Sequence, residues 1–390
     1  MTPKAELEKR ISNLYEVMKD KDYDTILIIN RINQYYFTGT MQDGVLVFRK
    51  DGTVKFFVRR SCDRARMECP LDIVCPMNTY KDMLDYLPSD LGIVYMETQT
   101  VTMAIKERLE KYFGFDAVKS IDRKICVLRA VKSDYELEFI KESGRQHEIL
   151  MTSIIPSILR DGMSETDFLS ELYMHMVKLG HHGLSRFNMF QMEMVIGQIG
   201  FGDNSTYPTN FDGPGGMKGM SPAVPIIGDR NRYLKKGDLV FVDVGYGVEG
   251  YHSDKSQVYS FKAKPDDRVL EIHRACMEVQ KKTASMMKEG AVPSEIYERI
   301  MAELPASLVN FMGMYDPVRF LGHGVGLHID EFPIIAKGFN LPLKQNMVVS
   351  LEPKCALEKT GTVGVEETYV IGRDGAECIT GGARDIIVVD

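Results

Sequence analysis

Short apolar runs alternate with amphipathic segments over the first 125 residues, which predicts strands separated by helices. The apolar runs lie at residues 25–29, 44–48, 54–58 and 92–96. The two middle runs flank an Asp51-Gly52 turn, an arrangement typical of a β-hairpin. Amphipathic helices are expected at residues 4–19 and 100–113. Strands that alternate with helices favour a small α/β domain, which we place at residues 1–130.

From residue 131 onward the pattern changes to long helices followed by groups of strands. Ser133-Asp134-Tyr135-Glu136 has the spacing of a capping box, so a long helix is expected from there to about Ile158. A second cap at Ser164 predicts a helix as far as Leu179. The other expected elements are a loop or short hairpins at 195–234, a strand pair at 238–262, helices at 266–288 and 294–303, and short strands at 346–390. This mixture predicts an α+β domain at residues 131–390.

Composition narrows the class of protein. Hydrophobic residues make up 44% and charged residues 26% of the 390 positions, which is ordinary for a globular protein. A formal net charge of −7 without any Lys/Arg block argues against a nucleic-acid partner. No apolar stretch approaches the roughly 18 residues of a spanning helix, and the polar N-terminus does not resemble a signal peptide. Seven scattered cysteines favour reduced thiols, so we expect a cytoplasmic protein with no membrane partner.

Five candidate metal ligands follow strand-like or glycine-rich segments in the last third of the chain. They are Asp243, Asp254, His323, Glu352 and Glu366. Asp243 ends the apolar run 239–242 and would share a strand face with Phe241, where a bare carboxylate is costly to bury. Any one of the acids could instead be an edge-strand or salt-bridged carboxylate. Together, four carboxylates and one imidazole suit two close divalent cations and a bridging water better than a single structural zinc.

The segments around these residues resemble those of the creatinase–prolidase–aminopeptidase P superfamily. In chain order they are Asp243-Val244-Gly245, Gly250-Tyr251-His252-Ser253-Asp254, Gly322-His323-Gly324-Val325-Gly326, Glu352-Pro353 and Glu366-Glu367-Thr368. The resemblance implies a pita-bread catalytic domain of the α+β class at residues 131–390. It also implies a smaller creatinase-like α/β domain at residues 1–130.

The same resemblance implies a dinuclear metal centre. Asp254 and Glu366 would bridge two divalent metal ions. Asp243 would complete one metal site, and His323 and Glu352 would complete the other. Glu352 would also act as general base on a metal-bridging water. Manganese is the expected metal, with Co, Zn or Fe as alternatives. The implied function is that of a homodimeric metallohydrolase, an Xaa-Pro dipeptidase or aminopeptidase that cuts the amide bond before proline in short peptides.

The chain departs from this superfamily at residues that would bind substrate. Prolyl peptidases of the group carry two further histidines, one of them in the loop before the first metal Asp. Here no His lies between His182 and His252, and the loop at 213–222 is rich in glycine. The second His belongs to a His-Glu-x-Pro segment, which in this chain begins with Asp330 and has His328 two residues earlier.

Three interpretations of this last segment remain open. His328 could take the missing role or pair with Asp330 as an oriented acid–base couple, since both would point the same way from an extended segment. Asp330 could instead face the site as a carboxylate, which would favour a cationic substrate or a proton abstraction. Finally, His328 could be a surface residue while Asp330 caps a turn. His252 is expected to face solvent.

Two neighbouring positions also differ from the superfamily. Ser256-Gln257 stands where Thr-Arg is common, and Gly364 stands where an Arg often precedes the last metal Glu. Loss of Arg beside carboxylates removes charge compensation and should change local pKa values.

Three functions therefore stay open. The first is a peptidase for Xaa-Pro substrates. The second is an enzyme with the same fold and metals that acts on a small, possibly cationic non-peptide substrate as an amidohydrolase or lyase. The third is a non-catalytic binding module. For the first two functions, the partner would be a short peptide or a small molecule.

Overall fold

The computed structural model describes residues 1–304, 308 and 319–390. The chain divides into two compact units, Met1–Leu128 and Arg129–Asp390. None of the helices in the described ranges is long and apolar enough to cross a membrane.

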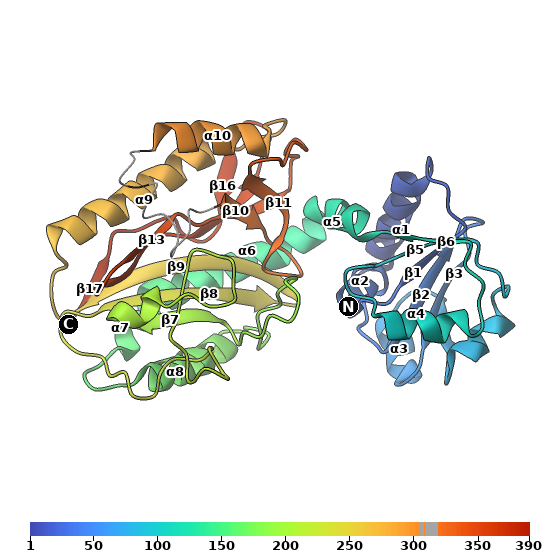
Figure 1. Ribbon diagram of the computed structural model, residues 1–390, viewed down its shortest axis with the longest axis horizontal. Coiled ribbons are helices and arrows are strands. Elements are labelled where there is room, and N and C mark those ends of the chain that lie inside the picture. The colour runs from blue at the N-terminus through green and yellow to red at the C-terminus, as the bar shows by residue number, and fades with distance from the viewer. Residues whose placement is uncertain (305–307, 309–318) are drawn as a thin grey trace. The chain divides into compact units, whose positions relative to one another are not determined.

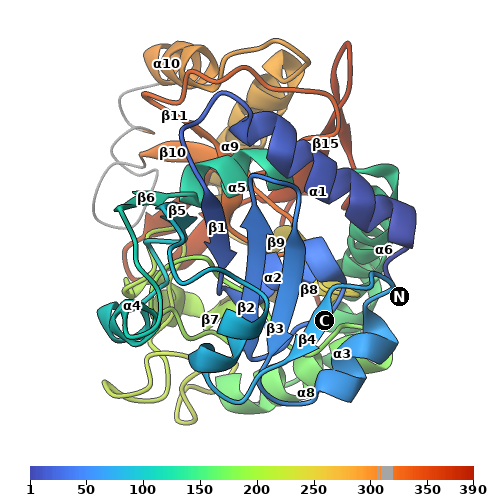
Figure 2. The ribbon, with the colours of Figure 1, turned by 90° about the vertical axis from the view of Figure 1, so that its right-hand side faces the viewer.

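The N-terminal unit is built on a six-stranded sheet in the order β4-β3-β2-β1-β5-β6. The strands are β1 (Thr25–Ile28), β2 (Gly44–Arg49), β3 (Val54–Val58), β4 (Val74–Pro76), β5 (Ile93–Met96) and β6 (Ala117–Ser120). The helices are α1 (Lys4–Met18), α2 (Arg31–Thr38), α3 (Cys62–Glu68) and α4 (Met103–Glu110), with a 3₁₀ turn η1 at Tyr80–Asp85. Strands β2 and β3 pair antiparallel, which confirms the predicted hairpin, and Figure 2 shows β1, β2 and β3 side by side.

Helix α5 (Asp122–Ala130) contains the division between the units, and only its last two residues belong to the second unit. The second unit continues with α6 (Asp134–Ile149), a π-helical turn η2 (Leu150–Ile154), α7 (Ile155–Ile158) and α8 (Glu165–Lys178). Later helices are α9 (Asp267–Met286) and α10 (Pro293–Glu303), and a 3₁₀ turn η3 spans Gly202–Thr206. The Ser133 hydroxyl accepts from the Glu136 amide, and the Ser133 amide donates back to the Glu136 carboxylate. This confirms the predicted capping box, and Ser164 caps α8 in the same way.

Three sheets follow in this unit. A four-stranded sheet has the order β17-β9-β8-β7, a five-stranded sheet has the order β11-β10-β12-β15-β16, and β13 pairs with β14. The first sheet contains β7 (Gly197–Phe201), β8 (Leu239–Val248), β9 (Tyr251–Phe261) and β17 (Ile387–Val389). The others contain β10 (Phe320–Gly324), β11 (Glu331–Ala336), β12 (Val348–Leu351), β13 (Lys354–Leu357), β14 (Gly361–Gly364), β15 (Glu367–Ile371) and β16 (Ala376–Cys378).

Strand β8 is buried on both faces and separates two hydrophobic cores. Leu239 and Phe241 pack in the core beneath α9 and α10, whereas Val240 and Val242 pack in the core that includes α8. Figure 1 shows these helices on opposite sides of β8 and β9. Because side chains alternate along a strand, Asp243 projects toward the same side as Phe241, where the five-stranded sheet lies. This alternation positions the candidate site between the two sheets.

Candidate metal centre

The structure brings all five predicted ligands together, from both sheets. Asp243 and Asp254 come from the paired strands β8 and β9. His323 lies in β10, Glu352 follows β12, and Glu366 precedes β15 and forms an isolated bridge to Ser256 of β9. Each of the five is at most 9% exposed to solvent. The β8–β9 pair and three later segments of the chain thus converge on one buried, strongly acidic site.

His323 is oriented as a ligand. Its Nδ1 lies 3.1 Å from the carbonyl oxygen of Gly324, and since a carbonyl only accepts, Nδ1 carries the hydrogen. The lone pair of Nε2 is then free to bind a cation, which is the usual arrangement of a metal-binding histidine. Nε2 lies 3.9 Å from Oδ2 of Asp254 and 3.7 Å from Oε1 of Glu366.

The group of Asp254, His323 and Glu366 fits one divalent cation. One donor atom from each can be chosen so that all three lie within 4.8 Å of one another. Oε1 of Glu352 lies 3.3 Å from Nε2 of His323 and has no hydrogen-bond partner among the described residues. A buried carboxylate oxygen without a partner is costly, so this oxygen also favours a positive charge at the same place.

The electrostatics reflect the crowding of four acids. Burial raises the pKa of Asp254 well above its ordinary value, and the neighbouring Glu366 and Asp243 raise it further. Burial alone would lower the pKa of His323, but Glu352 and Glu366 hold it well above its ordinary value. Protons and cations therefore compete for the same oxygens and nitrogen, which is the expected behaviour of a metal-binding cluster.

A lysine occupies the other half of the cluster. Asp243, Glu352 and Glu366 form a second group with metal-binding spacing, but Nζ of Lys354 donates to all three. The ligand pattern did not predict this residue. Lys354 lies two residues after Glu352, and this spacing puts both side chains on one face of an extended segment. That spacing is the sequence feature that could have identified Lys354 as a site residue.

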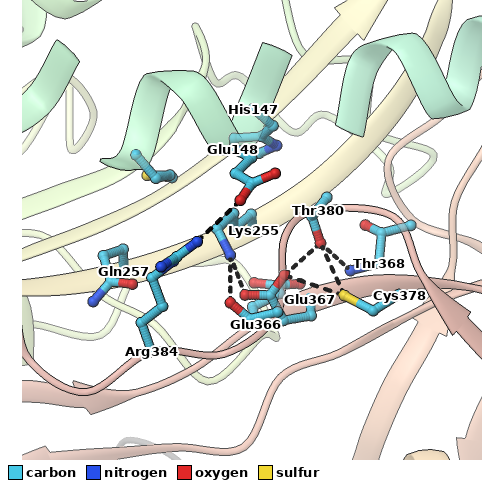
Figure 3. Close-up of polar contacts among 12 residues, drawn as sticks. His147, Glu148, Lys255, Gln257, Glu366, Glu367, Thr368, Cys378, Thr380 and Arg384 are labelled. Atoms are coloured by element: carbon cyan, nitrogen blue, oxygen red, sulfur yellow. Dashed lines mark hydrogen bonds and ion pairs between the residues drawn. The ribbon is translucent and has the colours of Figure 1, made fainter. Parts of the chain in front are cut away.

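A second buried ion pair lies beside the cluster (Figure 3). Lys255, next to Asp254, pairs with Glu367, next to Glu366, and both side chains are inaccessible to solvent. Glu367 also accepts a 2.5 Å hydrogen bond from the Thr380 hydroxyl. Gln257 and Gly364 stand where the superfamily often has Arg, which suggested a loss of positive charge. Lys255 and Lys354 supply positive charge near these two positions.

The cluster borders a cavity with an apolar wall. Asp243, Asp254, His323, Glu352 and Glu366 line it together with Phe187, Met194, Phe211, Ile329, Gly197, Gly245 and Gln198. The rings of Phe187 and Phe211 meet edge to face with centroids 5.5 Å apart. A β-carbon at Gly245 would lie 2.2 Å from Cδ1 of Ile329, so the glycine of the Asp-x-Gly segment lets Ile329 reach the cavity.

Gln198 is a cavity residue that sequence reasoning missed. It is 2% exposed, and neither its amide nitrogen nor its amide oxygen has a hydrogen-bond partner among the described residues. It pairs with Asp243 in the β7–β8 ladder. The glycine-rich loop packs on it, because a β-carbon at Gly215 would lie 2.0 Å from its Oε1 and 3.1 Å from Oδ2 of Asp243. The loop that lacks the expected histidine therefore still reaches the site, with its backbone.

His328 and Asp330 flank Ile329 and form their hydrogen bonds with residues other than the candidate ligands. Burial raises the pKa of Asp330 more than the charge of His323 lowers it. Nδ1 of His328 lies 2.9 Å from Nη2 of Arg129, and burial lowers the pKa of His328 to about 3. His328 is only 6% exposed, so its interpretation as a surface residue is wrong. Asp330 accepts hydrogen bonds from the backbone amides of Asn188 and Met189, and burial raises its pKa to about 6.

His252 was expected to face solvent, and this expectation is wrong. It is fully buried in β9, where its Nδ1 lies 3.0 Å from the Gly326 carbonyl oxygen and its Nε2 accepts from the Arg186 amide. Strand β9 is buried along its whole length, on both faces, so His252 is buried whichever face it occupies.

Comparisons with known proteins agree with this architecture. The model of metallopeptidase family M24 matches residues 138–373, and that of the creatinase/prolidase N-terminal domain matches residues 10–131. The chain is 24% identical to the Xaa-Pro dipeptidase of Pyrococcus furiosus over 386 residues, covering 98% of this chain and all of the relative. Among solved structures, the prolidase from Pyrococcus horikoshii OT3 superposes with a TM-score of 0.80 at 21% identity, covering 97% of this chain and 100% of that one. The Xaa-Pro dipeptidase from Bacillus anthracis gives the same TM-score and identity, with coverages of 98% and 99%.

Proposed function

Because the chain belongs to metallopeptidase family M24, with a creatinase/prolidase N-terminal domain ahead of an α+β pita-bread catalytic domain, we propose that it cleaves the amide bond before proline in short peptides. It is a metallohydrolase by family. The observation that supports the proposal most is the cavity itself, which has acidic ligands on one side and an apolar wall on the other. Relatives named Xaa-Pro dipeptidases point the same way.

Asp254, His323 and Glu366 would hold the catalytic cation. When bound, a divalent ion supplies Lewis-acid polarisation of the scissile carbonyl and lowers the pKa of a nearby water. We propose Mn²⁺, because hard carboxylate oxygens dominate the donor set and one imidazole completes it. Co, Zn and Fe remain the alternatives for a metal analysis.

Glu352 would take the proton from the attacking water. Its Oε1 is buried, lacks a hydrogen-bond partner among the described residues, and lies beside His323. Its Oε2 is fixed by Lys354 at 2.9 Å, so the carboxylate cannot turn away from that position without losing a hydrogen bond. A fixed, unpartnered carboxylate oxygen is suited to act as general base.

The substrate would lie between Gln198 and the apolar wall. The Gln198 amide can donate to a peptide carbonyl, which is one task of the histidine that this chain lacks. Phe187, Phe211 and Ile329 would pack against the pyrrolidine ring of proline.

His328 and Asp330 would support this wall. Asp330 holds the backbone next to Phe187 through Asn188 and Met189. His328 is fixed by Arg129. A homodimer, expected from the resemblance, is part of the proposal, and sedimentation equilibrium would test it.

The direct test is hydrolysis of a panel of Xaa-Pro dipeptides by protein loaded with Mn²⁺. We expect turnover of Xaa-Pro and at least tenfold less of matched Xaa-Ala dipeptides. Glu352→Gln should lower kcat by at least about 100-fold, because general-base catalysis contributes that much. Glu358→Gln is the matched control, since Glu358 is exposed in the same hairpin region. Absence of Xaa-Pro turnover at full metal occupancy would contradict the proposal and favour the non-peptide alternative.

A further inference from the structure

Lys354 occupies the place of a cation among three of the candidate ligands. Its Nζ lies 2.8 Å from Oδ2 of Asp243, 2.9 Å from Oε2 of Glu352 and 2.6 Å from Oε2 of Glu366. A lysine ammonium has three N–H donors, and each of these carboxylates accepts one hydrogen bond. Each N–H of the ammonium thus has a carboxylate acceptor.

The backbone packs closely around residue 354. Lys354 pairs with Gly364 in the β13–β14 ladder. Gly364 has a φ of +132°, and a β-carbon on it would lie 2.6 Å from Cα and 3.2 Å from Cβ of Lys354. A side chain at residue 364 would therefore collide with the base of the lysine. The side chain of Lys354 is fully inaccessible to solvent, so an ammonium that left the three carboxylates would remain buried without its partners.

The ammonium and a metal ion exclude one another from this position. Divalent transition metals bind carboxylate oxygens at about 2.0–2.2 Å. An ion at that distance from the oxygens of Asp243, Glu352 and Glu366 would overlap Nζ, which lies within 2.9 Å of all three. The residues present therefore do not fit a metal ion on the Asp243 side of the cluster.

The remaining half of the cluster differs in the surroundings of its carboxylate oxygens. No lysine contacts Oε1 of Glu352, which is buried and without a hydrogen-bond partner among the described residues. This oxygen faces Nε2 of His323. Glu352 thus gives one oxygen to the ammonium and turns the other toward the group of Asp254, His323 and Glu366.

We infer that the Lys354 ammonium replaces one of the two metal ions, and that the protein binds a single divalent cation at Asp254, His323 and Glu366. An ammonium has no open coordination position, so the Asp243 side neutralises charge and fixes carboxylates but cannot bind a water or a substrate oxygen as a metal would. This inference rests on the proposed function for the identity of the site as a hydrolytic centre. It changes that site from a dinuclear centre to a mixed centre of one metal ion and one fixed ammonium.

The test is the metal content of wild-type protein and of Lys354→Ala. Both are purified in the presence of Mn²⁺, dialysed, and measured by elemental analysis and by electron paramagnetic resonance. Wild-type protein should hold one Mn²⁺ per chain and give the six-line signal of an isolated ion. Lys354→Ala should hold two Mn²⁺ per chain and give the broadened signal of a spin-coupled pair. Lys255→Ala is the matched control, since it removes the other buried ammonium near the cluster and should leave one Mn²⁺ per chain.

Each outcome decides the inference. Two Mn²⁺ per chain in wild type, or no Mn²⁺ at all, would overturn it. One Mn²⁺ in both wild type and Lys354→Ala would show that the lysine does not hold the place of a metal. If Lys354→Ala fails to fold, the wild-type stoichiometry and spectrum decide alone. Xaa-Pro hydrolysis is assayed on the same loaded samples. One Mn²⁺ per chain without turnover would contradict only the proposed function. Two Mn²⁺ per chain with turnover would contradict only the inference.

Discussion

At the scale of single residues, the buried carboxylate of Glu331 connects the start of the catalytic unit to the segment beside the cavity. It pairs with Arg129 and with Lys132 at 3.3 Å, and it accepts from the His328 amide at 2.8 Å. Burial alone would raise the pKa of Glu331, but the two cations lower it from 4.5 to about 2. Arg129 also contacts the His328 ring. Glu331 therefore orders both Arg129 and His328, the residue that precedes Ile329.

Replacing Glu331 by Gln should therefore destabilise the protein in a pH-dependent way. A pKa that is lowered on folding contributes stability above about pH 4.5, and this contribution is lost as the pH falls through 2. We expect Glu331→Gln to lower the free energy of unfolding by about 3 kcal/mol at pH 7, with a gap that narrows below pH 4.5. Urea denaturation at several pH values would measure it. The exposed Glu358→Gln should show no gap, and a gap for Glu331→Gln that stayed constant down to pH 3 would contradict the role of its charge.

At the scale of elements, the cap of α8 is a local feature with a measurable contribution. The Ser164 hydroxyl accepts from the Asp167 amide at 3.1 Å, and the Asp167 carboxylate accepts from the Ser164 amide at 3.0 Å. Ser164→Ala should lower the free energy of unfolding by about 1 kcal/mol, because the Asp167 amide at the helix start loses its side-chain acceptor. Ser170→Ala in the same helix is the control: Ser170 is exposed and bonds only the Thr166 carbonyl in the described structure. Equal effects of the two substitutions on thermal unfolding would argue against a specific cap.

Such local signals explain which parts of the fold could be predicted. The capping boxes at Ser133 and Ser164 and the hairpin around Asp51-Gly52 depend on residues that are close in the sequence. Within the order β11-β10-β12-β15-β16, the pairings of β10 with β12 and of β12 with β15 join strands that are distant in the sequence, which no local pattern specifies. Burial of His252 was missed for the same reason, since its surroundings come from Gly326 and Arg186.

In the candidate site, too, features carried by local sequence were predictable and features that depend on distant contacts were not. The five candidate ligands could be named because each lies in or beside a strand-like or glycine-rich segment that resembles those of the superfamily. Lys354 and Gln198 could not be named as site residues from the sequence. Lys354 matters because it donates to carboxylates of the cluster, and Gln198 because its buried amide has no hydrogen-bond partner among the described residues. Asp330 and His328 were identified as unusual, yet only the structure gives their partners, Asn188 and Arg129.

At the scale of the whole molecule, the candidate cation links the two sheets of the catalytic unit. Asp254 belongs to the four-stranded sheet, whereas His323 belongs to the five-stranded sheet and Glu366 lies directly before its strand β15. A cation that binds only the folded state stabilises it by about 2.7 kcal/mol when its free concentration is 100 times its dissociation constant. The unit Met1–Leu128 contains none of these ligands.

Mn²⁺ should therefore protect one unit and not the other. In hydrogen–deuterium exchange of the full chain, we expect slower exchange in peptides from β8, β9, β10 and β15 when Mn²⁺ is added, because opening either sheet there would break the metal site. Peptides from residues 1–128 should exchange at the same rate with and without Mn²⁺. Asp254→Asn, which removes one ligand charge, should abolish most of the protection while leaving the N-terminal peptides unchanged. Equal protection of both units, or protection that survives Asp254→Asn, would mean that Mn²⁺ acts elsewhere than at the cluster that joins the sheets.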